Sequence, residues 1–357
     1  MKKGLFICGT PYHVISSIVL KYQLNIDADI ILYDSFPNID MLQKNIKDAN
    51  IFTNIRVINK EKEYGMPKKL ISRYFFAFWG YLNINRMISK VLYNIKEYTD
   101  VYFANDQNID IIDRYNYCYI KKYFPNICTH YYEDGLGSYH DDHYDLTKLD
   151  YLFRKTLVGN NTHIFDSDIY LYSPELYKLL NPNSKRKILE IKKIDQKIIQ
   201  TLKKVFSYFI EDIEGYNAII FDTVRNEEFT QKGSADYNNI VKKIFDGEKK
   251  KYRPIVKPHP RERKRFFEYD YFKMEGFPFE IFCLFYDFNN ILFVNNYSNA
   301  VFTPKILFDQ EPHIIFTCKV LANEMLDKKG DRIKHIDCFI KLYRDGSKIS
   351  VLDEKKI

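Results

Sequence analysis

Residues that could carry acid–base chemistry gather in the stretch THYYEDGLGSYHDDHYD, from Thr129 to Asp145. Glu133 and Asp134 precede Gly135 at the end of an apolar run, where a carboxylate on a tight turn could act as a general base. Neighbouring side chains of a strand point to opposite sides. Asp134 is therefore the candidate base, whereas Glu133 is expected to be structural or, with Gly135, to bind the substrate.

A second group of this kind is the stretch VKPHPRERKRFF in the second half of the chain. Pro258 and Pro260 restrict the backbone on both sides of His259, and Lys257 adds a cation. A histidine with basic neighbours at a strand end suits contact with a phosphate, as a general acid or an electrostatic stabiliser. No nucleic-acid motif accompanies this basic run, so nucleic-acid binding is not expected.

Side chains of types that bind metals follow the two acids, at 140–143, and an Asp-x-Asp pattern occurs at 166–168. Adjacent residues of one loop rarely converge on one ion without further ligands. We therefore expect no metal. His140 and His143 are expected to line the acceptor side of a cleft or to be solvated.

The loop after the first apolar run contains Gly9 and Thr10, whose backbone amides could approach an anionic ligand such as a nucleotide phosphate. A single glycine does not make the GxGxxG fingerprint of dinucleotide-binding proteins. His13 stands at the start of the next helical pattern. It could contact the acceptor or the donor, or have no ligand at all.

These residues need elements that bring strand ends together, and the chain alternates apolar runs with helical patterns. Strands are expected at 4–8, 28–34, 54–59, 100–105, 129–134, 217–223, 253–259, 290–296 and 312–318. Helices are expected at 13–24, 38–48, 67–97, 108–123, 195–211, 236–246, 278–286 and 319–343. Such alternation is typical of α/β proteins with parallel sheets, whose sites lie at the carboxyl ends of the strands.

The length of 357 residues predicts two domains. A linker is expected near 173–194, which is rich in proline, asparagine and basic residues, and it separates domains 1–180 and 181–357. The predicted fold is two Rossmann-like domains facing a central cleft. We expect no transmembrane helix, because no run of about 18 apolar residues occurs, and no signal peptide, because polar residues interrupt the first apolar run.

The formal charge of +7 favours anionic ligands or membrane surfaces. The six cysteines form no CxxC pair, which argues against a zinc ribbon or a disulfide framework and suits a reducing cytoplasm. Residues 68–98 combine aromatic and basic side chains. They predict either an amphipathic helix packed on the sheet or a helix lying in a membrane interface.

Taken together, the acid-acid-glycine at 133–135 and the Lys-x-His-Pro at 257–260 resemble the two hallmark motifs of bacterial sialyltransferases. The stretches LFICGTPYH, EDGLGSY and KPHPRE are most similar to glycosyltransferase family 52, the lipooligosaccharide and capsule sialyltransferases. The resemblance implies a GT-B fold and an inverting transfer without a metal or other cofactor. Sialic acid would pass from CMP-sialic acid to a terminal galactose of a bacterial surface glycan, with an α2,3 linkage expected.

The resemblance also implies roles for residues of the second domain, which would bind the CMP donor while the first domain binds the acceptor. Lys257 and Pro258 would lie at the nucleotide, Glu280 would bind its ribose and Ser298 its phosphate. Related enzymes carry a second hydroxyl residue directly after this serine, but here that position is Asn299. Of the pair, only Ser298 is therefore available to bind the phosphate.

The general base has a second candidate. Members of the family also use an aspartate shortly before the His-Pro pair, and Asp236 would be that residue unless it is a helix N-cap or a first-turn acid. If Asp236 is the base, Asp134 becomes an acceptor-binding or structural residue. The sequence leaves the two alternatives open.

Two further functions remain as alternatives. One is a GT-B glycosyltransferase of the same family with another nucleotide-sugar donor. The other is a non-catalytic, membrane-peripheral protein of capsule assembly. In each case we expect a cytoplasmic protein, in contact with the inner membrane or not, as a monomer or a homodimer.

Overall fold

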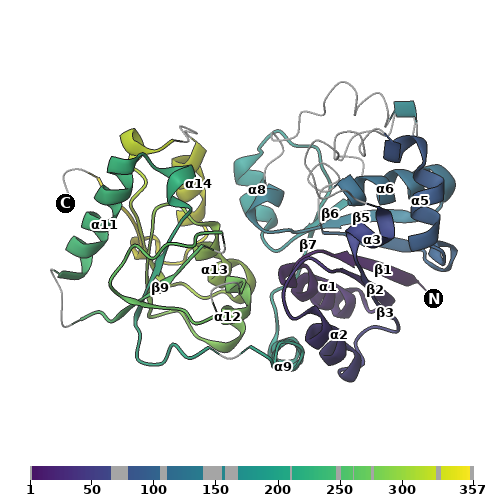
Figure 1. Ribbon diagram of the computed structural model, residues 1–357, viewed down its shortest axis with the longest axis horizontal. Coiled ribbons are helices and arrows are strands. Elements are labelled where there is room, and N and C mark those ends of the chain that lie inside the picture. The colour runs from purple at the N-terminus through teal and green to yellow at the C-terminus, as the bar shows by residue number, and fades with distance from the viewer. Residues whose placement is uncertain are drawn as a thin grey trace. The chain divides into compact units, whose positions relative to one another are not determined.

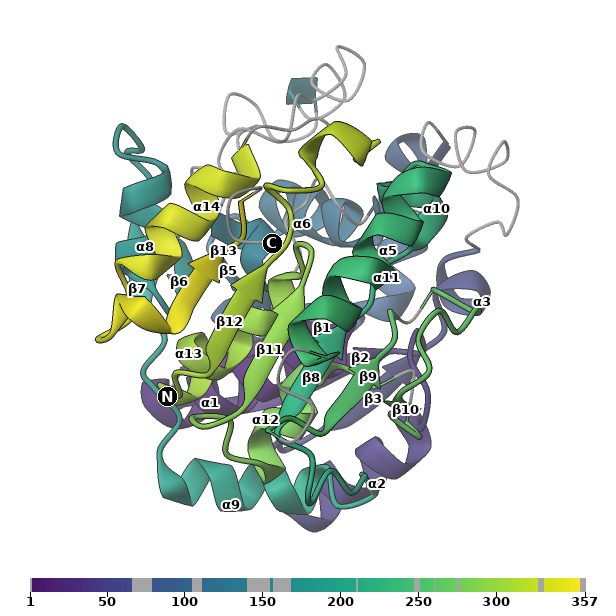
Figure 2. The ribbon, with the colours of Figure 1, turned by 90° about the vertical axis from the view of Figure 1, so that its left-hand side faces the viewer.

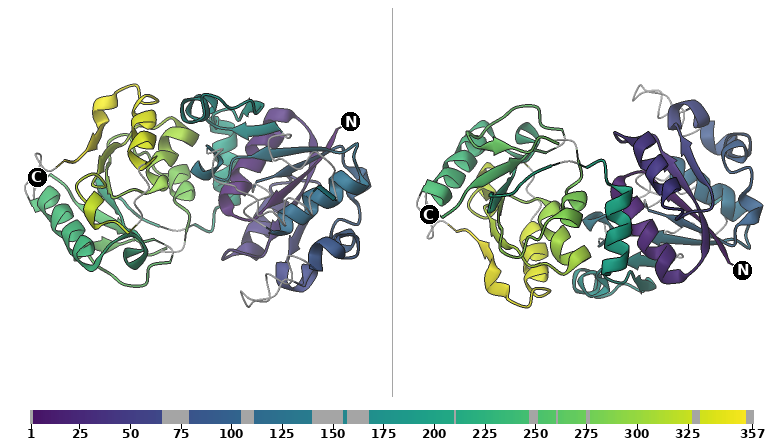
Figure 3. Two further views of the ribbon diagram at one scale, coloured as in Figure 1. Left: turned by 90° about the horizontal axis from the view of Figure 1, so that it is seen from above. Right: turned by 90° about the horizontal axis from the view of Figure 1, so that it is seen from below.

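The computed structural model describes residues 2–65, 79–104, 111–139, 155–156, 168–209, 211–246, 251–259, 261–274, 277–326 and 331–353. The chain divides into two α/β units, Met1–Phe206 and Ser207–Ile357 (Figure 1). Each unit contains one parallel sheet with helices on both of its faces (Figure 3). Two Rossmann-like units in one chain are the building plan of GT-B proteins, and the predicted fold class is confirmed at the level of these units.

The sheet of the first unit has the strand order β3-β2-β1-β4-β5-β6-β7 in its described part, and all pairs are parallel. Its strands are β1 Lys3–Cys8, β2 Asp27–Tyr33, β3 Ile55–Ile58, β4 Asp100–Phe103, β5 Cys128–Tyr132, β6 Asp168–Leu171 and β7 Ile188–Glu190. The central strands are buried along most of their length and are mainly apolar, because a parallel sheet is covered on both faces.

The helices of the first unit lie on both faces of this sheet, with α1 and α2 on one face and α5 and α6 on the other (Figure 1). They are α1 Pro11–Leu24, α2 Ile39–Asp48, α3 Lys60–Tyr64, α5 Ile84–Val91, α6 Ile111–Tyr123, α8 Pro174–Leu180 and α9 Gln196–Val205, with short 3-10 turns η1 Ile95–Glu97 and η2 Leu136–Tyr139. Helix α1 begins where Thr10 caps the backbone amide of His13 and proline supplies the first turn.

The division between the units falls later than the sequence predicts. The expected linker at 173–194 contains α8 and β7, and β7 pairs with β6 in the first sheet. Helix α9 packs against α1 and α2, and the Val205 carbonyl accepts a hydrogen bond from Asn45 Nδ2 of α2 (2.9 Å). Prolines and basic residues around 173–194 therefore mark short turns inside the first unit, and the chain leaves it at Phe206.

The sheet of the second unit has the order β10-β9-β8-β11-β12-β13, again with all pairs parallel (Figure 2). The strands are β8 Ala218–Phe221, β9 Pro254–Lys257, β10 Asp270–Tyr271, β11 Leu292–Asn295, β12 His313–Phe316 and β13 Ile349–Val351. The helices are α10 Arg225–Glu228, α11 Gln231–Asp246, α12 Phe279–Phe285, α13 Thr303–Phe308 and α14 Asp331–Ile340, with 3-10 turns η4 Asn299–Phe302, η5 Ala322–Glu324 and η6 Gly346–Lys348.

The second sheet reverses its direction of growth between β8 and β11. From β8 the chain proceeds outward to β9 and β10, then returns to β11 and continues to β12 and β13 on the other side. In open α/β sheets, ligands bind at such a switch point, outside the carboxyl ends of the strands. The first sheet has an equivalent switch point between β1 and β4.

Two predicted helices differ in extent from those in the structure. The helix expected at 319–343 is instead a 3-10 turn, η5, and a separate helix α14, with 327–330 outside the described residues. The expected long helix at 67–97 is described from residue 79 onward, where it includes α5 and ends in η1. Among the described residues, no helix combines the length and apolar character that crossing a membrane would require.

Candidate functional site

A cavity of about 580 Å³ opens at the switch point of the second sheet. Ligand sites of enzymes commonly have volumes of this order. The cavity combines aromatic walls with polar and charged groups. Its lining residues are Phe221, Asp222, Thr223, Glu228, Lys257, Pro258, His259, Phe277, Pro278, Phe279, Glu280, Asn296, Tyr297, Ser298 and Ala300.

Every residue of the second unit that the sequence predicts for the nucleotide lies in this lining. Lys257, Pro258 and His259 come from the carboxyl end of β9, Glu280 from the first turn of α12, and Ser298 from the segment after β11. These three segments are far apart in the sequence. The parallel sheet brings them together because β9 and β11 flank β8 and end at the same edge.

Lys257 is a buried cation that faces the cavity. The residue is 7% exposed, and none of the described residues forms an ion pair with its amine. Burial lowers the pKa of Lys257 to about 8, although the nearby Glu280 carboxylate partly opposes this shift. A buried ammonium without a paired anion is costly, so an anionic ligand would supply the missing partner.

His259 is half-buried at the edge of the cavity. Its Nδ1 accepts a hydrogen bond from the backbone N–H of Arg261 (3.2 Å), which assigns the proton of the neutral ring to Nε2. Burial, followed by the charges of Arg261 and Lys257, lowers the pKa of His259. At neutral pH the ring is therefore a neutral donor, Nε2–H, until a bound anion raises its pKa.

The loop after β8 is held by a buried ion pair between Asp222 and Arg225. Arg225 Nε donates to Asp222 Oδ1 at 2.7 Å, and the rest of the guanidinium donates to the Ser234 carbonyl (3.2 Å) and to Asn238 Oδ1 (3.1 Å). The guanidinium also lies 4.7 Å from the centre of the Phe266 ring. This network ties the cavity floor to α11.

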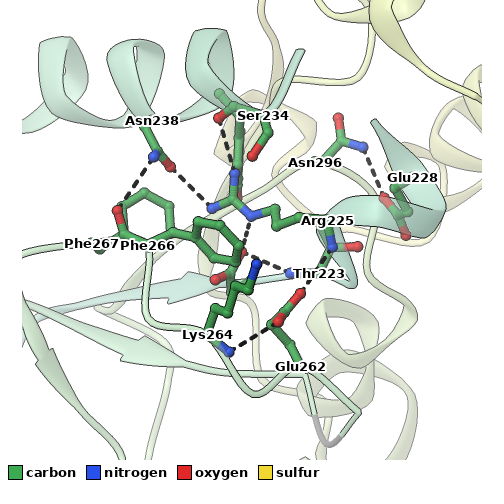
Figure 4. Close-up of polar contacts among 12 residues, drawn as sticks. Thr223, Arg225, Glu228, Ser234, Asn238, Glu262, Lys264, Phe266, Phe267 and Asn296 are labelled. Carbon is green, nitrogen blue, oxygen red and sulfur yellow. Dashed lines mark hydrogen bonds and ion pairs between the residues drawn. The ribbon is translucent and has the colours of Figure 1, made fainter. Parts of the chain in front are cut away.

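A second set of contacts positions the segment that carries Ser298. The Asn295 side chain accepts a hydrogen bond from the Ser298 backbone N–H (2.9 Å), and Asn296 donates to the Glu228 carboxylate at 3.2 Å (Figure 4). Asp222, Glu228 and Asn296 were not predicted from the sequence. Asp222 and Asn296 directly follow apolar strands, which is the signal that could have found them.

At the switch point of the first sheet, the predicted residues His13 and Asp134 contact each other. His13 is fully buried, and its Nδ1 accepts a hydrogen bond from the Gly9 backbone N–H at 2.9 Å. Its Nε2–H is therefore directed to the Asp134 carboxylate, with which it forms a short hydrogen bond. Both ring nitrogens are engaged within the chain, and Thr10 caps the helix that carries the ring.

Glu133 points into the protein interior. Its carboxylate accepts hydrogen bonds from the hydroxyls of Tyr12 (2.6 Å) and Tyr139 (2.5 Å) and from the Tyr172 backbone N–H (2.9 Å). Burial raises the pKa of Glu133 to about 7, against the lowering effect of these three donors. Glu133 is thus held inside the first unit by three donors, as expected for the structural one of its two predicted roles.

Gly135 terminates this strand end with a φ of +99°, a conformation that favours glycine. The turn continues into η2, and Ser138 accepts a hydrogen bond from the Asp134 backbone N–H (2.9 Å). Gly135 therefore determines the path of the backbone at this turn. His140 and the rest of the run 140–143 lie outside the described residues.

Asp236, the second candidate base, lies on α11 and does not line the cavity. It is the sixth residue of this helix, so it is neither an N-cap nor a first-turn acid. Its charge acts on Lys232, one helical turn away, whose amine is bound to Glu324 at 2.8 Å.

No group of three histidine, cysteine or acidic side chains that could hold a metal ion occurs within the described ranges. Of the Asp-x-Asp pattern at 166–168, only Asp168 is described. It forms an ion pair with Lys187 on the neighbouring strand segment (2.8 Å).

No family model matches this sequence, and no curated protein matches it. Several solved structures are similar. A UDP-GlcNAc 2-epimerase of Methanocaldococcus jannaschii, solved with UDP-GlcNAc and UDP, is 16% identical with a TM-score of 0.45, over 88% of this chain and 83% of that chain. TcCGT1 with UDP is 9% identical with a TM-score of 0.46, over 99% and 86%. UGT2 of Phytolacca americana is 7% identical with a TM-score of 0.46, over 99% and 87%.

Proposed function

We propose that this protein is a glycosyltransferase whose second unit binds a nucleotide-sugar donor, and that the donor is CMP-sialic acid. The observation that carries the proposal is the convergence of Lys257, His259, Glu280 and Ser298 on one cavity at a switch point. These are the residues for which the resemblance to family 52 sialyltransferases implies contacts with the nucleotide. They come from three separate segments, so their meeting is not a consequence of sequence proximity.

The charges around the cavity favour a donor with a single phosphate. Lys257 contributes one buried cation, His259 contributes a neutral donor, and the Asp222 charge is balanced by Arg225. Glu228 and Glu280 add carboxyl groups to the lining. A diphosphate would bring two negative charges to the one buried cation of this lining, whereas the phosphodiester of CMP-sialic acid brings one.

In the proposed reaction, the acceptor hydroxyl oxygen attacks the anomeric carbon of sialic acid, and the bond from that carbon to the phosphate oxygen breaks. The electron pair leaves with CMP. His259 Nε2–H and the Lys257 amine stabilise the charge that develops on the leaving phosphate, and Ser298 contributes a hydroxyl donor. No residue is required to form a covalent intermediate, and the configuration of the anomeric carbon inverts.

The proton of the acceptor hydroxyl passes to Asp134. A neutral, buried His13 orients this carboxylate through its Nε2–H. Catalytic groups in other enzymes are oriented by a neighbouring hydrogen-bond partner in the same way. Asp134 is one-quarter exposed, and among the described residues only its Oδ1 accepts a hydrogen bond from a side chain. Among the described residues, Asp236 on α11 has no partner that orients its carboxylate in this way, which supports Asp134 as the base.

Thermal stabilisation by nucleotides tests the proposal. CMP should raise the melting temperature of the wild type, because a ligand that binds only the folded state stabilises it, while UDP and GDP at equal concentration should not. Lys257→Met should strongly reduce the shift, and Asp236→Asn, outside the cavity, should retain it. Stabilisation by UDP alone would overturn the assignment of the donor.

A further inference from the structure

An exposed stripe of apolar and basic side chains runs along the outer face of the helical segment that contains α5. The α5 stripe consists of Trp79, Leu82, Arg86, Lys90 and Tyr93. The three apolar members are 48%, 65% and 69% exposed, in that order. Eight large apolar side chains of the described residues are exposed, and three of them lie in this stripe, including the two with the largest exposed fractions, Leu82 and Tyr93.

The members of the stripe follow a helical spacing. They are separated by three, four, four and three positions, the spacing of neighbours on one side of an α-helix. A turn at Asn83 separates the helical residues 79–82 from α5, and hydrogen bonds link the two, because the Asn83 N–H donates to the Trp79 carbonyl and the Met87 N–H donates to the Asn83 carbonyl, each at 3.0 Å. Tyr93 lies after the C-cap residue Leu92, outside α5.

The opposite face of the same helix is buried in the core. Ile84, Met87, Ile88 and Val91 are buried, and α5 lies beside α6 (Figure 1). Gly80 lies so close to Tyr115 of α6 that a Cβ at position 80 would meet that ring at 2.5 Å. The α5 stripe therefore cannot rotate inward, and it faces away from the protein.

The charge of this region is uniformly positive. Between Glu63 and Glu97 the sequence contains no acidic residue, and both cations of the stripe are exposed. Arg56 adds a third cation, because its guanidinium lies 4.8 Å from the centre of the Tyr93 ring. Tryptophan, tyrosine and leucine interleaved with arginine and lysine are the composition of helices that lie in a membrane interface.

We propose that the α5 stripe docks the protein on the surface of a membrane that contains anionic lipids. The apolar members enter the boundary between head groups and acyl chains, and Arg86, Lys90 and Arg56 contact the negative head groups. A second copy of the chain is a poorer occupant, because a two-fold interface would set the same cations against one another. The docking is independent of the nucleotide and acceptor proposed above.

Sedimentation with lipid vesicles tests this inference without any measurement of activity. The wild type should bind vesicles of phosphatidylcholine with phosphatidylglycerol, bind vesicles of phosphatidylcholine alone much more weakly, and lose binding at high salt. Arg86→Gln/Lys90→Gln should weaken binding to the anionic vesicles by roughly thirtyfold. Leu82→Gln should weaken it by roughly tenfold.

Matched controls come from the second unit. Leu326 is 54% exposed, and Lys242 and Lys243 are exposed cations of α11. Leu326→Gln and Lys242→Gln/Lys243→Gln should bind the vesicles as the wild type does, and all variants should keep the melting temperature of the wild type. Absence of wild-type binding, or equal losses in stripe and control variants, would overturn the proposal. So would a dimer that Leu82→Gln converts to a monomer while vesicle binding is unchanged.

Discussion

The polar groups at the two switch points are organised in opposite ways. In the first unit they satisfy one another: Glu133 receives three hydrogen bonds, and both nitrogens of His13 are engaged. In the second unit, the Lys257 amine and the His259 Nε2–H face a cavity. The first arrangement fixes the position of one carboxylate, Asp134. The second leaves the Lys257 amine and the His259 N–H available for an anionic ligand, as a nucleotide site requires.

The largest effect is expected at the carboxylate that the first unit positions. Asp134→Asn preserves the shape of the side chain but removes the base, so turnover should fall about a thousandfold. The melting temperature should stay near that of the wild type. Asp236→Asn, assayed beside it for product formation, should keep most of the turnover. If Asp236→Asn is inactive and Asp134→Asn is active, the base is Asp236 of the second unit.

His259→Gln should lower turnover by about a hundredfold, because the amide does not place its donor where the imidazole Nε2–H stabilises the charge on the leaving phosphate. The affinity for CMP should change much less than turnover, and titration calorimetry would measure it. A loss of CMP affinity as large as the loss of turnover would make His259 a binding residue only.

Lys257→Met separates binding from stability. CMP affinity should fall about thirtyfold, since a charged contact is lost. The folded protein should become more stable at pH 7, because burial lowers the pKa of Lys257 from 10.5 to about 8 and the charged form is costly to bury.

The sign of this effect follows from proton binding. Between pH 8 and pH 10.5 the unfolded chain holds a proton on Lys257 that the folded chain has lost. The free energy of unfolding of the wild type therefore rises over this range. The stability gap between Lys257→Met and the wild type should be about 3 kcal/mol larger at pH 7 than above pH 10.5. Urea unfolding across pH measures it, and a gap independent of pH would contradict the account of Lys257.

Glu133→Gln probes the satisfied site. The folded carboxyl has its pKa raised to about 7 from 4.5, so the folded state binds the extra proton and the wild type loses stability as pH rises through this range. The glutamine variant lacks this loss. Its stability relative to the wild type should rise by up to about 3 kcal/mol from pH 4.5 to pH 7. Turnover should fall far less than in Asp134→Asn, and an equal fall would make Glu133 a direct participant.

The smallest effect is expected at the turn that follows Asp134. Gly135→Ala places a side chain at a φ of +99° and should cost about 1 kcal/mol of stability, with a less than tenfold loss of turnover. Gly137→Ala is the matched control, because a Cβ there also meets open space but no positive φ is imposed. Equal stability of the two alanine variants would show that Gly135 is not required by the backbone.

Much of this comparison could be predicted from local patterns. Apolar runs located the central strands to within a few residues. The carboxyl-end rule, together with the resemblance to family 52, placed Lys257, His259 and Ser298 at one site. Contacts between distant segments could not be predicted. The bond between His13 and Asp134 joins residues 121 positions apart, and two of the partners of Arg225, Ser234 and Asn238, lie on α11.

The domain boundary was misplaced for a related reason. Short strands such as β6 and β7 carry little periodic signal, so the prolines and basic residues beside them suggested a linker at 173–194. Whether that segment belongs to the first unit depends on strand pairing and on α9 packing against α1 and α2. These are tertiary contacts that composition does not encode.

Incubation of the wild type with CMP-sialic acid and a lactose-type acceptor tests the central claim most directly, with the product linkage determined by NMR. We predict release of CMP and formation of sialyl-lactose with an α2,3 linkage, and no product from Asp134→Asn. Absence of product from CMP-sialic acid, together with sugar transfer from a UDP-linked donor to the same acceptor, would contradict the account.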